Sequence, residues 1–439
     1  MSQSNKLTSL EKKWVLYDVG NSAWVLFAST ILPIYFSSLV QGQDGVATTL
    51  WGYASSIVAL IALFICPIFG TLADFSGKRK FFFGFALLGI CGCAILSLPI
   101  LTPIIFLIFY ILTEVGLSSS CVFYDSMLTD VTTDDRVHNV SANGYAWGYI
   151  GSCIPFLVCL LLVLVVPNEV IAMKWRMIAA FIITAAWWLC FTLPIFKSYE
   201  QKHYLPKPAH PVKETFSRLG QIFKEIKQNK KAFLFLLAFF LYINGTSTII
   251  KMATVYGEDM LHFETTQLLL ALLLTQIVAF PSAILMGKLS KKFEDKWLIL
   301  VCISGYVAVS LFALFLKFEW QFWLLAVVVG MFQGGIQAMS RSYFTRIIPS
   351  EKSGEYFGIY DIFAKGAATL GPALVSTFTL IFSNVPTTVS AVMNLELIPI
   401  PLLTIAGLVM FIIAAKHPTF QKEETIAEEP ATENAQSEE

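Results

Sequence analysis

Long apolar stretches alternate with short polar segments along nearly the whole chain. A helix needs roughly 20 mainly apolar residues to cross a bilayer, and the sequence contains twelve stretches of this kind. They are residues 14–40, 50–73, 81–99, 103–123, 144–166, 174–196, 232–256, 266–288, 297–316, 320–343, 355–380 and 396–415. The pattern predicts an all-α membrane protein with twelve transmembrane helices.

The composition supports the same class of protein. Of the 439 residues, 56% are hydrophobic and 14% are charged, whereas soluble domains hold roughly 45–50% and 25%. The excess apolar surface must face lipid, which excludes a secreted disulfide scaffold, a nucleic-acid binder and an ordinary soluble enzyme. The eight cysteines show no spacing typical of a metal site. We therefore expect no metal and no cofactor.

Basic residues predict the orientation, because cytoplasmic loops of membrane proteins are rich in Lys and Arg. Of the 30 such residues, 25 fall at the termini or after every second predicted span, three in the opposite loops and two within spans. Both termini are therefore expected in the cytoplasm. The long basic connection 197–231 has helical apolar spacing from Val212 to Ile226, which fits an amphipathic surface helix or a simple charged linker. The acidic end of the chain, 417–439, is predicted to be disordered.

Two halves of the chain repeat one another. Gly70 and Gly287 both follow a predicted span and lie 217 residues apart, while Tyr124 and Tyr343 lie 219 apart at corresponding span ends. Many secondary transporters are built from such repeats and bind substrate between them near the middle of the membrane. The sequence predicts two pseudo-symmetric six-helix halves, 1–196 and 232–416.

The segment after the second predicted span carries a recognisable motif, GTLADFSGKRK at positions 70–80. Gly70 permits close helix packing, Gly77 permits a tight turn, and Asp74 with Lys78 and Arg79 can form a charge latch that breaks and re-forms. The basic residues can also serve only to fix the topology. This motif resembles the loop motif of the major facilitator superfamily, and the resemblance implies that the loop helps to switch between inward-open and outward-open states.

A narrower resemblance rests on three further segments: YDVGNSAW at 17–24, GGIQAMSRS at 334–342, and EYFGIY at 355–360 with Lys365 and LGP at 370–372. Together they look like the vacuole effluxer branch of the superfamily, the autophagy-related protein 22-like proteins. The branch is named for fungal proteins that export amino acids from the vacuole. The resemblance implies the major facilitator fold and export of a small polar solute.

Four charged positions stand out inside predicted spans, where a charge is costly and usually faces a cavity or a partner. They are Asp18, Glu114, Lys251 and Lys365. By resemblance, the first, fourth, seventh and tenth spans line the central cavity. Glu114 is therefore the leading candidate proton carrier and Asp18 the second. The alternative for Glu114 is a permanent ion pair with Lys365 or Lys251.

Uncharged amides within the spans are candidate contacts to substrate: Asn21, Asn244, Gln333 and Gln337. Each is also a common packing device between membrane helices. Lys365 is a candidate partner for a substrate carboxylate, with an ion pair to Asp361 as the alternative.

The favoured function is a secondary active transporter of a small polar solute such as an amino acid, working by alternating access and driven by protons. No phosphate-binding loop for ATP is present in the sequence. One alternative is a non-transporting membrane sensor. Another is a membrane-embedded lipid-modifying enzyme, although Asp125 and Asp130, the conceivable metal pair, lie five residues apart and so off one helix face. The expected partners are the lipid bilayer of the cell membrane, the solute and a proton, with no nucleic acid, and the expected state is a monomer.

Overall fold

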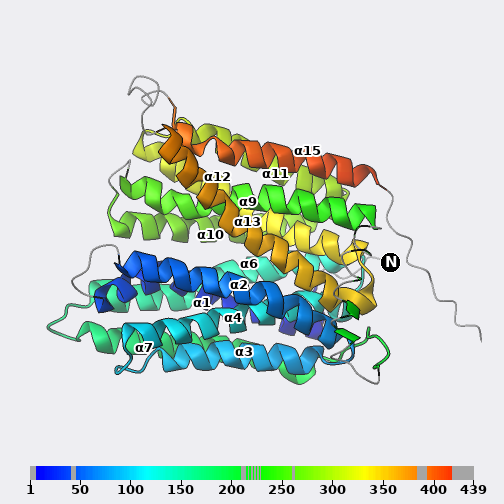
Figure 1. Cartoon of the computed structure of the whole chain (residues 1–439), viewed down its shortest axis with the longest axis horizontal. Coiled ribbons are helices and arrows are strands. Elements are labelled where there is room, and N and C mark those ends of the chain that lie inside the picture. The colour runs from blue at the N-terminus through cyan, green and yellow to red at the C-terminus, as the bar shows by residue number, and fades with distance from the viewer. Residues whose placement is uncertain are drawn as a thin grey trace, which may run out of the picture.

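The structure is a computed structural model that describes residues 6–40, 46–208, 229–259, 263–382 and 393–417, with single positions between 214 and 227. The elements in this part of the chain are helices, most of them long and packed side by side (Figure 1). The end of the bundle at which the first helix begins and the last helix ends is called the terminal face below.

Every predicted stretch coincides with a helix. Within the described residues, twelve helices have 18 residues or more. These are α1 (Ser9–Leu39), α2 (Val46–Asp74), α3 (Lys78–Ile95), α4 (Pro103–Ser126), α6 (Val137–Leu160), α7 (Met173–Ser198), α9 (Lys230–Asp259), α10 (Thr265–Leu289), α11 (Asp295–Ala313), α12 (Glu319–Ile347), α13 (Ser353–Phe382) and α15 (Pro399–Lys416). Short elements join them: α5 (Leu128–Val131), the π-helical η1 (Leu161–Val165), and the 3-10 turns η2 (Ser350–Lys352) and η3 (Leu395–Leu397).

Length and composition identify ten membrane-crossing helices among the described residues. The two long helices outside this set are α3 and α13. Helix α3 begins with three basic residues, and α13 carries Glu355, Asp361 and Lys365 in its first half.

Local sequence signals explain where several helices begin. Thr8 precedes α1 and accepts a hydrogen bond from the backbone N–H of Glu11, whose carboxylate accepts from the Thr8 N–H at 2.7 Å. This reciprocal pair is a capping box. Thr102 caps α4 in the same position, and Pro103 follows at the first helical residue, where a missing N–H costs nothing.

Two hydrophobic clusters divide the bundle. The first takes its buried members from residues 14–199, with Leu269 and Leu273 of α10 added. The second takes most of its members from residues 232–411 and adds four side chains of α2, α4 and α6. Figure 1 shows the corresponding arrangement, with α1, α3, α4 and α7 on one side and α9, α11 and α15 on the other.

Small residues allow the helices of the two clusters to approach closely. Helix α2 packs on α13, and α6 packs on α10. A Cβ atom on Gly70 would lie 2.4 Å from the carbonyl oxygen of Gly354, and one on Gly287 would lie 2.6 Å from the Cβ of Ala142. Neither contact leaves room for a side chain, so the close packing of α2 on α13 and of α6 on α10 depends on glycine.

Two predicted segments fall mainly outside the described residues. The apolar positions of the amphipathic helix expected from Val212 to Ile226 all lie outside the described residues. The acidic tail from 418 to 439 lies outside them as well. Those predictions stay predictions.

Candidate functional site

A cavity of about 280 Å³ lies on the boundary between the two clusters. Its walls come from α4, α6, α9, α12 and α13, so helices of both clusters contribute. The lining residues are Cys121, Val122, Asp125, Tyr145, Phe239, Ile243, Ser247, Gln337, Phe357, Tyr360, Asp361 and Ala364.

Helical periodicity explains why these residues share the cavity. Side chains three or four residues apart lie on one face of a helix. On α9 the lining positions are 239, 243 and 247, and on α13 they are 357, 360, 361 and 364. On α4, Asp125 follows Cys121 by four residues. Each wall is therefore a single helix face turned toward the boundary.

The guanidinium of Arg341 on α12 lies beside this cavity and joins helices of both clusters. It donates from Nη1 to Oδ1 of Asp125 on α4 at 2.9 Å and from Nη2 to Oδ2 of Asp18 on α1 at 3.4 Å. Its Nε donates to the hydroxyl of Ser141 on α6 at 3.0 Å. The Arg341 side chain is only 2% exposed. A buried cation of this kind requires its carboxylates, because removal of one partner leaves an uncompensated charge.

Aromatic rings complete the surroundings of Arg341. Its guanidinium carbon lies 4.1 Å from the ring centre of Tyr145, 4.7 Å from that of Trp14 and 5.5 Å from that of Tyr124. These distances are within the range of cation–π attraction. Tyr124 also donates from its hydroxyl to Oδ2 of Asp18 at 2.7 Å. Asp18, a predicted proton site, is thus part of the contact that holds α1 to α12.

Glu114 has a different partner from those expected. Its Oε1 accepts a hydrogen bond from the indole N–H of Trp24 at 2.7 Å. Lys365 forms an ion pair with Asp361, which was the alternative for that lysine, and Lys251 donates to the carbonyl oxygen of Ala368 at 2.9 Å. Glu114 is close enough to Lys365 for an electrostatic interaction, but the ion pair of Lys365 is with Asp361.

The predicted amides fall into two groups. Gln337 lines the cavity and accepts from the Tyr149 hydroxyl at 2.6 Å, and Asn21 donates to the thiol of Cys121, a lining residue, at 3.8 Å. Asn244 and Gln333 are buried outside the cavity lining. Neither the amide nitrogen nor the oxygen of Asn244 has a hydrogen-bond partner in the described part of the chain, and the same holds for the oxygen of Gln333.

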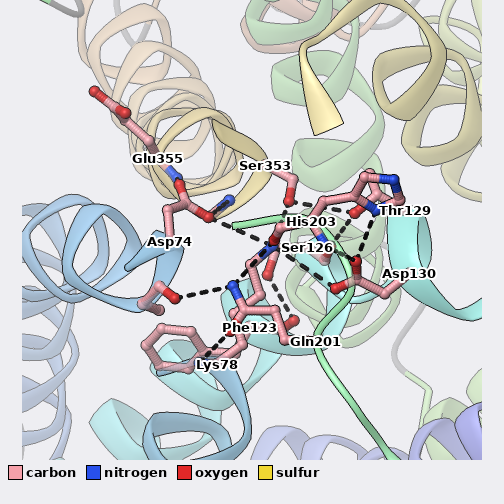
Figure 2. Close-up of polar contacts among 12 residues, drawn as sticks. Asp74, Lys78, Phe123, Ser126, Thr129, Asp130, Gln201, His203, Ser353 and Glu355 are labelled. Carbon is pink, nitrogen blue, oxygen red and sulfur yellow. Dashed lines mark hydrogen bonds and ion pairs between the residues drawn. The ribbon is translucent and has the colours of Figure 1, made fainter. Parts of the chain in front are cut away.

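The predicted latch forms a second contact between the clusters, at the terminal face (Figure 2). Asp74 accepts hydrogen bonds from the backbone N–H groups of Gly354 at 2.9 Å and Glu355 at 2.8 Å. These donors belong to the first turn of α13, where N–H groups have no partner within the helix and the helix dipole attracts an anion. Lys78 lies 3.4 Å from Asp74 and donates to the Ser353 hydroxyl at 2.6 Å. Asp74 and Lys78 are both fully buried.

The structure adds two details at Gly77 and Arg79 of the motif. The residue with a left-handed backbone in this turn is Ser76, at φ 70°, while Gly77 has φ −120°. A Cβ on Gly77 would lie 2.6 Å from the Phe81 ring, so a larger residue there would require the ring to move. Among the described residues, the Arg79 guanidinium lies 5.0 Å from the ring centre of Phe196 and forms no ion pair with Asp74.

Asp130 anchors the start of the connection between the clusters. Its Oδ1 accepts from the backbone N–H of His203 at 2.9 Å and from Nδ1 of the same residue at 2.8 Å, and Oδ2 accepts from the Tyr199 hydroxyl. Burial raises the pKa of Tyr199 well above its ordinary value, and the nearby Asp130 carboxylate adds to the rise. Tyr199 therefore stays a donor. Lys78 lies 3.9 Å from Asp130, so the anchor adjoins the latch (Figure 2).

The sequence analysis considered Asp125 only as half of a conceivable metal pair and did not name Arg341 as a candidate site residue. One signal for Asp125 was present: it follows Glu114 by eleven residues, about three helical turns, and so shares its helix face. The aromatic lining residues gave no such signal, because Phe and Tyr occur throughout the spans.

Known proteins resemble the chain over most of its length. The family described as "Vacuole effluxer Atg22 like" matches residues 47–408. An "Uncharacterized MFS-type transporter YxiO" from Bacillus subtilis (strain 168) is 40% identical over 407 residues, covering 91% of this chain and 95% of the relative. Autophagy-related protein 22 of Eremothecium gossypii is 24% identical over 394 residues, covering 80% and 75%.

Solved structures show the same fold at low identity. FucP, a major facilitator superfamily transporter in the outward conformation, has a TM-score of 0.68 at 14% identity and covers 94% of this chain and 100% of its own. The human organic anion transporter MFSD10 has a TM-score of 0.67 at 12% identity, covering 92% and 99%. The chain belongs to the Atg22-like vacuole effluxer family of major facilitator superfamily transporters.

Proposed function

We propose that the protein is a secondary active transporter that moves a small polar solute by alternating access. One observation carries the proposal: the cavity lies on the boundary between two helix clusters, beside a buried polar contact that joins them. A cavity in this place opens to one side of the membrane or to the other when the clusters rock against each other. The polar contacts of Arg341 and Asp74 would then break and re-form in each cycle.

The architecture that fits this function has twelve transmembrane helices, with α3 and α13 crossing the membrane as well. Residues 1–196 and 232–416 are two pseudo-symmetric halves, and 197–231 is the linker between them. The hydrophobic clusters follow this division closely. The concentration of basic residues on the terminal side supports a cytoplasmic position for both termini. The protein acts as a monomer in the cell membrane.

Protons drive the transport in this proposal, and Glu114 carries them. Its hydrogen bond from Trp24 leaves the carboxylate without a direct ion pair in the described residues, so either protonation state can be accommodated. Asp18 is the second proton site, since release of its contact with Arg341 would change its surroundings.

The solute contacts in this proposal come from the predicted amides and Lys365. Gln337 lines the cavity directly and Asn21 lies against a lining residue. Asn244 and Gln333 contain buried polar atoms that have no partner among the described residues, and such atoms are costly unless a ligand satisfies them. Amino acids present both donors and acceptors to amides, which makes them the first solutes to test.

Flux in proteoliposomes tests the proposal. The purified full-length protein is reconstituted with a pH-sensitive dye inside, and a gradient of each solute from a panel of amino acids, peptides, amines and sugars is imposed. We expect solute-dependent proton movement that Glu114→Gln abolishes, since the Gln oxygen can still accept from Trp24 but its amide cannot release a proton. Flux that survives intact in Glu114→Gln would remove Glu114 from the coupling. Lack of flux for the whole panel would contradict transport of these solutes.

A further inference from the structure

The walls of the boundary cavity have an unusual chemistry: they are aromatic and acidic. Tyr145, Phe239, Phe357 and Tyr360 supply four rings, and Asp125 and Asp361 supply two carboxylates. Among the described residues that line the cavity, there is no Lys, Arg or His. Such a set suits a positively charged ligand, because carboxylates attract it directly and ring faces attract it through their quadrupoles.

The charges next to the cavity are also unbalanced. Arg341 is shared between Asp125 and Asp18, at 2.9 and 3.4 Å, and Lys365 is paired with Asp361. Glu114 is the fourth carboxylate of this group and interacts electrostatically with Lys365. Four carboxylates therefore share two cations, and one net negative charge remains even when Glu114 holds a proton. A bound cation would neutralise this remaining negative charge, which is costly inside the membrane.

The protein itself shows how a cation is held here. The Arg341 guanidinium lies 4.1 Å from the ring centre of Tyr145 while it donates to Asp125. Tyr145 and Asp125 both line the cavity. A ligand ammonium group can use the same two kinds of partner from the cavity side.

The hydroxyl of Tyr360 has no hydrogen-bond partner among the described residues. Tyr360 is 8% exposed, it lines the cavity, and its ring stacks on Phe239 with the centres 4.1 Å apart. None of the hydrogen bonds within the described residues involves its hydroxyl. Its place in the cavity wall makes the hydroxyl available to a ligand.

We propose that this cavity binds a small organic cation, with Asp125 and Asp361 as its carboxylate partners and the rings of Tyr145, Phe239, Phe357 and Tyr360 as its walls. This inference rests on the proposed transport function and names its substrate class. It also supplies a link between binding and movement. A cation at Asp125 competes with Arg341 for the carboxylate and so weakens the contact between α4 and α12.

Equilibrium binding tests the inference without any need for transport. Full-length protein in lipid nanodiscs is titrated with choline, agmatine and tetraethylammonium, and with 3,3-dimethylbutan-1-ol, the uncharged counterpart of choline. We expect at least one of the three cations to bind. We also expect choline, or whichever of the three cations binds best, to bind at least tenfold more tightly than the alcohol. Binding of none of the three cations, or equal binding of choline and the alcohol, would overturn the inference.

Variants locate the site. Asp125→Asn and Asp361→Asn should each weaken binding of the cation at least tenfold, and Tyr360→Phe should weaken it severalfold because the ring stays in place. The control is Asp134→Asn, which changes an exposed carboxylate outside the cavity and should leave binding unchanged. Unaltered binding in both cavity Asn variants would overturn the assignment. If an Asn variant does not fold, Tyr360→Phe and the comparison with the alcohol still decide the question.

The binding and flux results separate the two proposals. Cation binding in nanodiscs without flux of that cation in proteoliposomes supports the site and contradicts transport. Flux of a neutral or acidic solute by a protein that binds none of the three cations supports transport and overturns the substrate class.

Discussion

Arg341 and Asp125 are 216 residues apart in the chain, yet Nη1 of the arginine donates to Oδ1 of the aspartate at 2.9 Å. The first residue belongs to α12 and the second to α4, so the contact crosses the boundary between the two hydrophobic clusters. Because Asp125 also lines the cavity, its carboxylate belongs both to the candidate binding site and to the contact with Arg341 that joins the two clusters.

Arg341→Lys tests whether this contact depends on the guanidinium. Lysine keeps the charge but cannot donate to Asp125, Asp18 and Ser141 together, and it lacks the flat group that lies against Tyr145. We expect solute flux in proteoliposomes to fall at least tenfold.

The matched control is Arg346→Lys on the same helix, because the Arg346 side chain is 44% exposed and contacts Asp295 at 3.0 Å. It should keep flux within about twofold, as surface ion pairs contribute little. Equal losses in the two variants would show that Arg341 has no special role.

Asp74→Asn tests the latch at the terminal face. Asparagine has the shape of aspartate but only one acceptor oxygen and no charge, so it cannot receive both N–H groups of Gly354 and Glu355 as the carboxylate does. Hydrogen bonds to a charged group contribute about 1.5–3 kcal/mol each, and Lys78 would lose one of its two buried counter-ions, keeping Asp130 at 3.9 Å. We expect a lower melting temperature and a loss of flux. Asp134→Asn, in an exposed position, should change neither, and a melting temperature for Asp74→Asn equal to that of wild type would contradict the assignment.

Gly70→Ala tests the close approach of α2 and α13. The added Cβ would lie 2.4 Å from a backbone oxygen, so the two helices must separate. Overpacking of this kind costs about 1–3 kcal/mol. Gly84→Ala is the control, because nothing lies within 4 Å of a Cβ at that position and alanine favours helices. We expect thermal unfolding of Gly70→Ala at lower temperature and of Gly84→Ala at the same or higher temperature; the reverse order would refute the packing argument.

Asn244→Leu separates a binding role from a structural one. Since neither amide atom has a partner among the described residues, replacement by an apolar side chain of similar size removes no hydrogen bond within the protein and should keep or raise the melting temperature. If Asn244 contacts the solute, flux should fall about tenfold at the same time. Unchanged flux would exclude Asn244 from the solute path.

The sequence and the structure agree best where local pattern decides the outcome. Each long apolar stretch forms a helix because its length and composition leave no other way to satisfy the backbone in lipid. The latch was also predictable in outline, since Gly70, Asp74 and Lys78 stand in one short motif. Its backbone detail was not: the left-handed residue is Ser76, for which the flanking Gly77 is the more typical choice.

Contacts between distant helices were less predictable. Periodicity places Asp125 and Glu114 on one face of α4, but it does not say that α12 lies opposite and brings Arg341 to that face. For the same reason, the alternative considered for Glu114 was an ion pair with a lysine, whereas the structure provides the indole of Trp24. Packing over the whole bundle decides which helices are neighbours, and no local pattern in a single sequence specifies it.

The distance between the two clusters at the terminal face is the most direct test of the account. Lys80 of α3 and Lys291, just after α10, are both exposed. Each is replaced by a cysteine that carries a spin label, in a protein from which the eight native cysteines have been removed. Pulsed electron resonance then measures the distance between the two labels. We expect a short distance in the wild type and a second, longer distance that gains population in Arg341→Gln and in Asp74→Asn. A single distance that neither variant changes would contradict alternating access controlled by these two contacts.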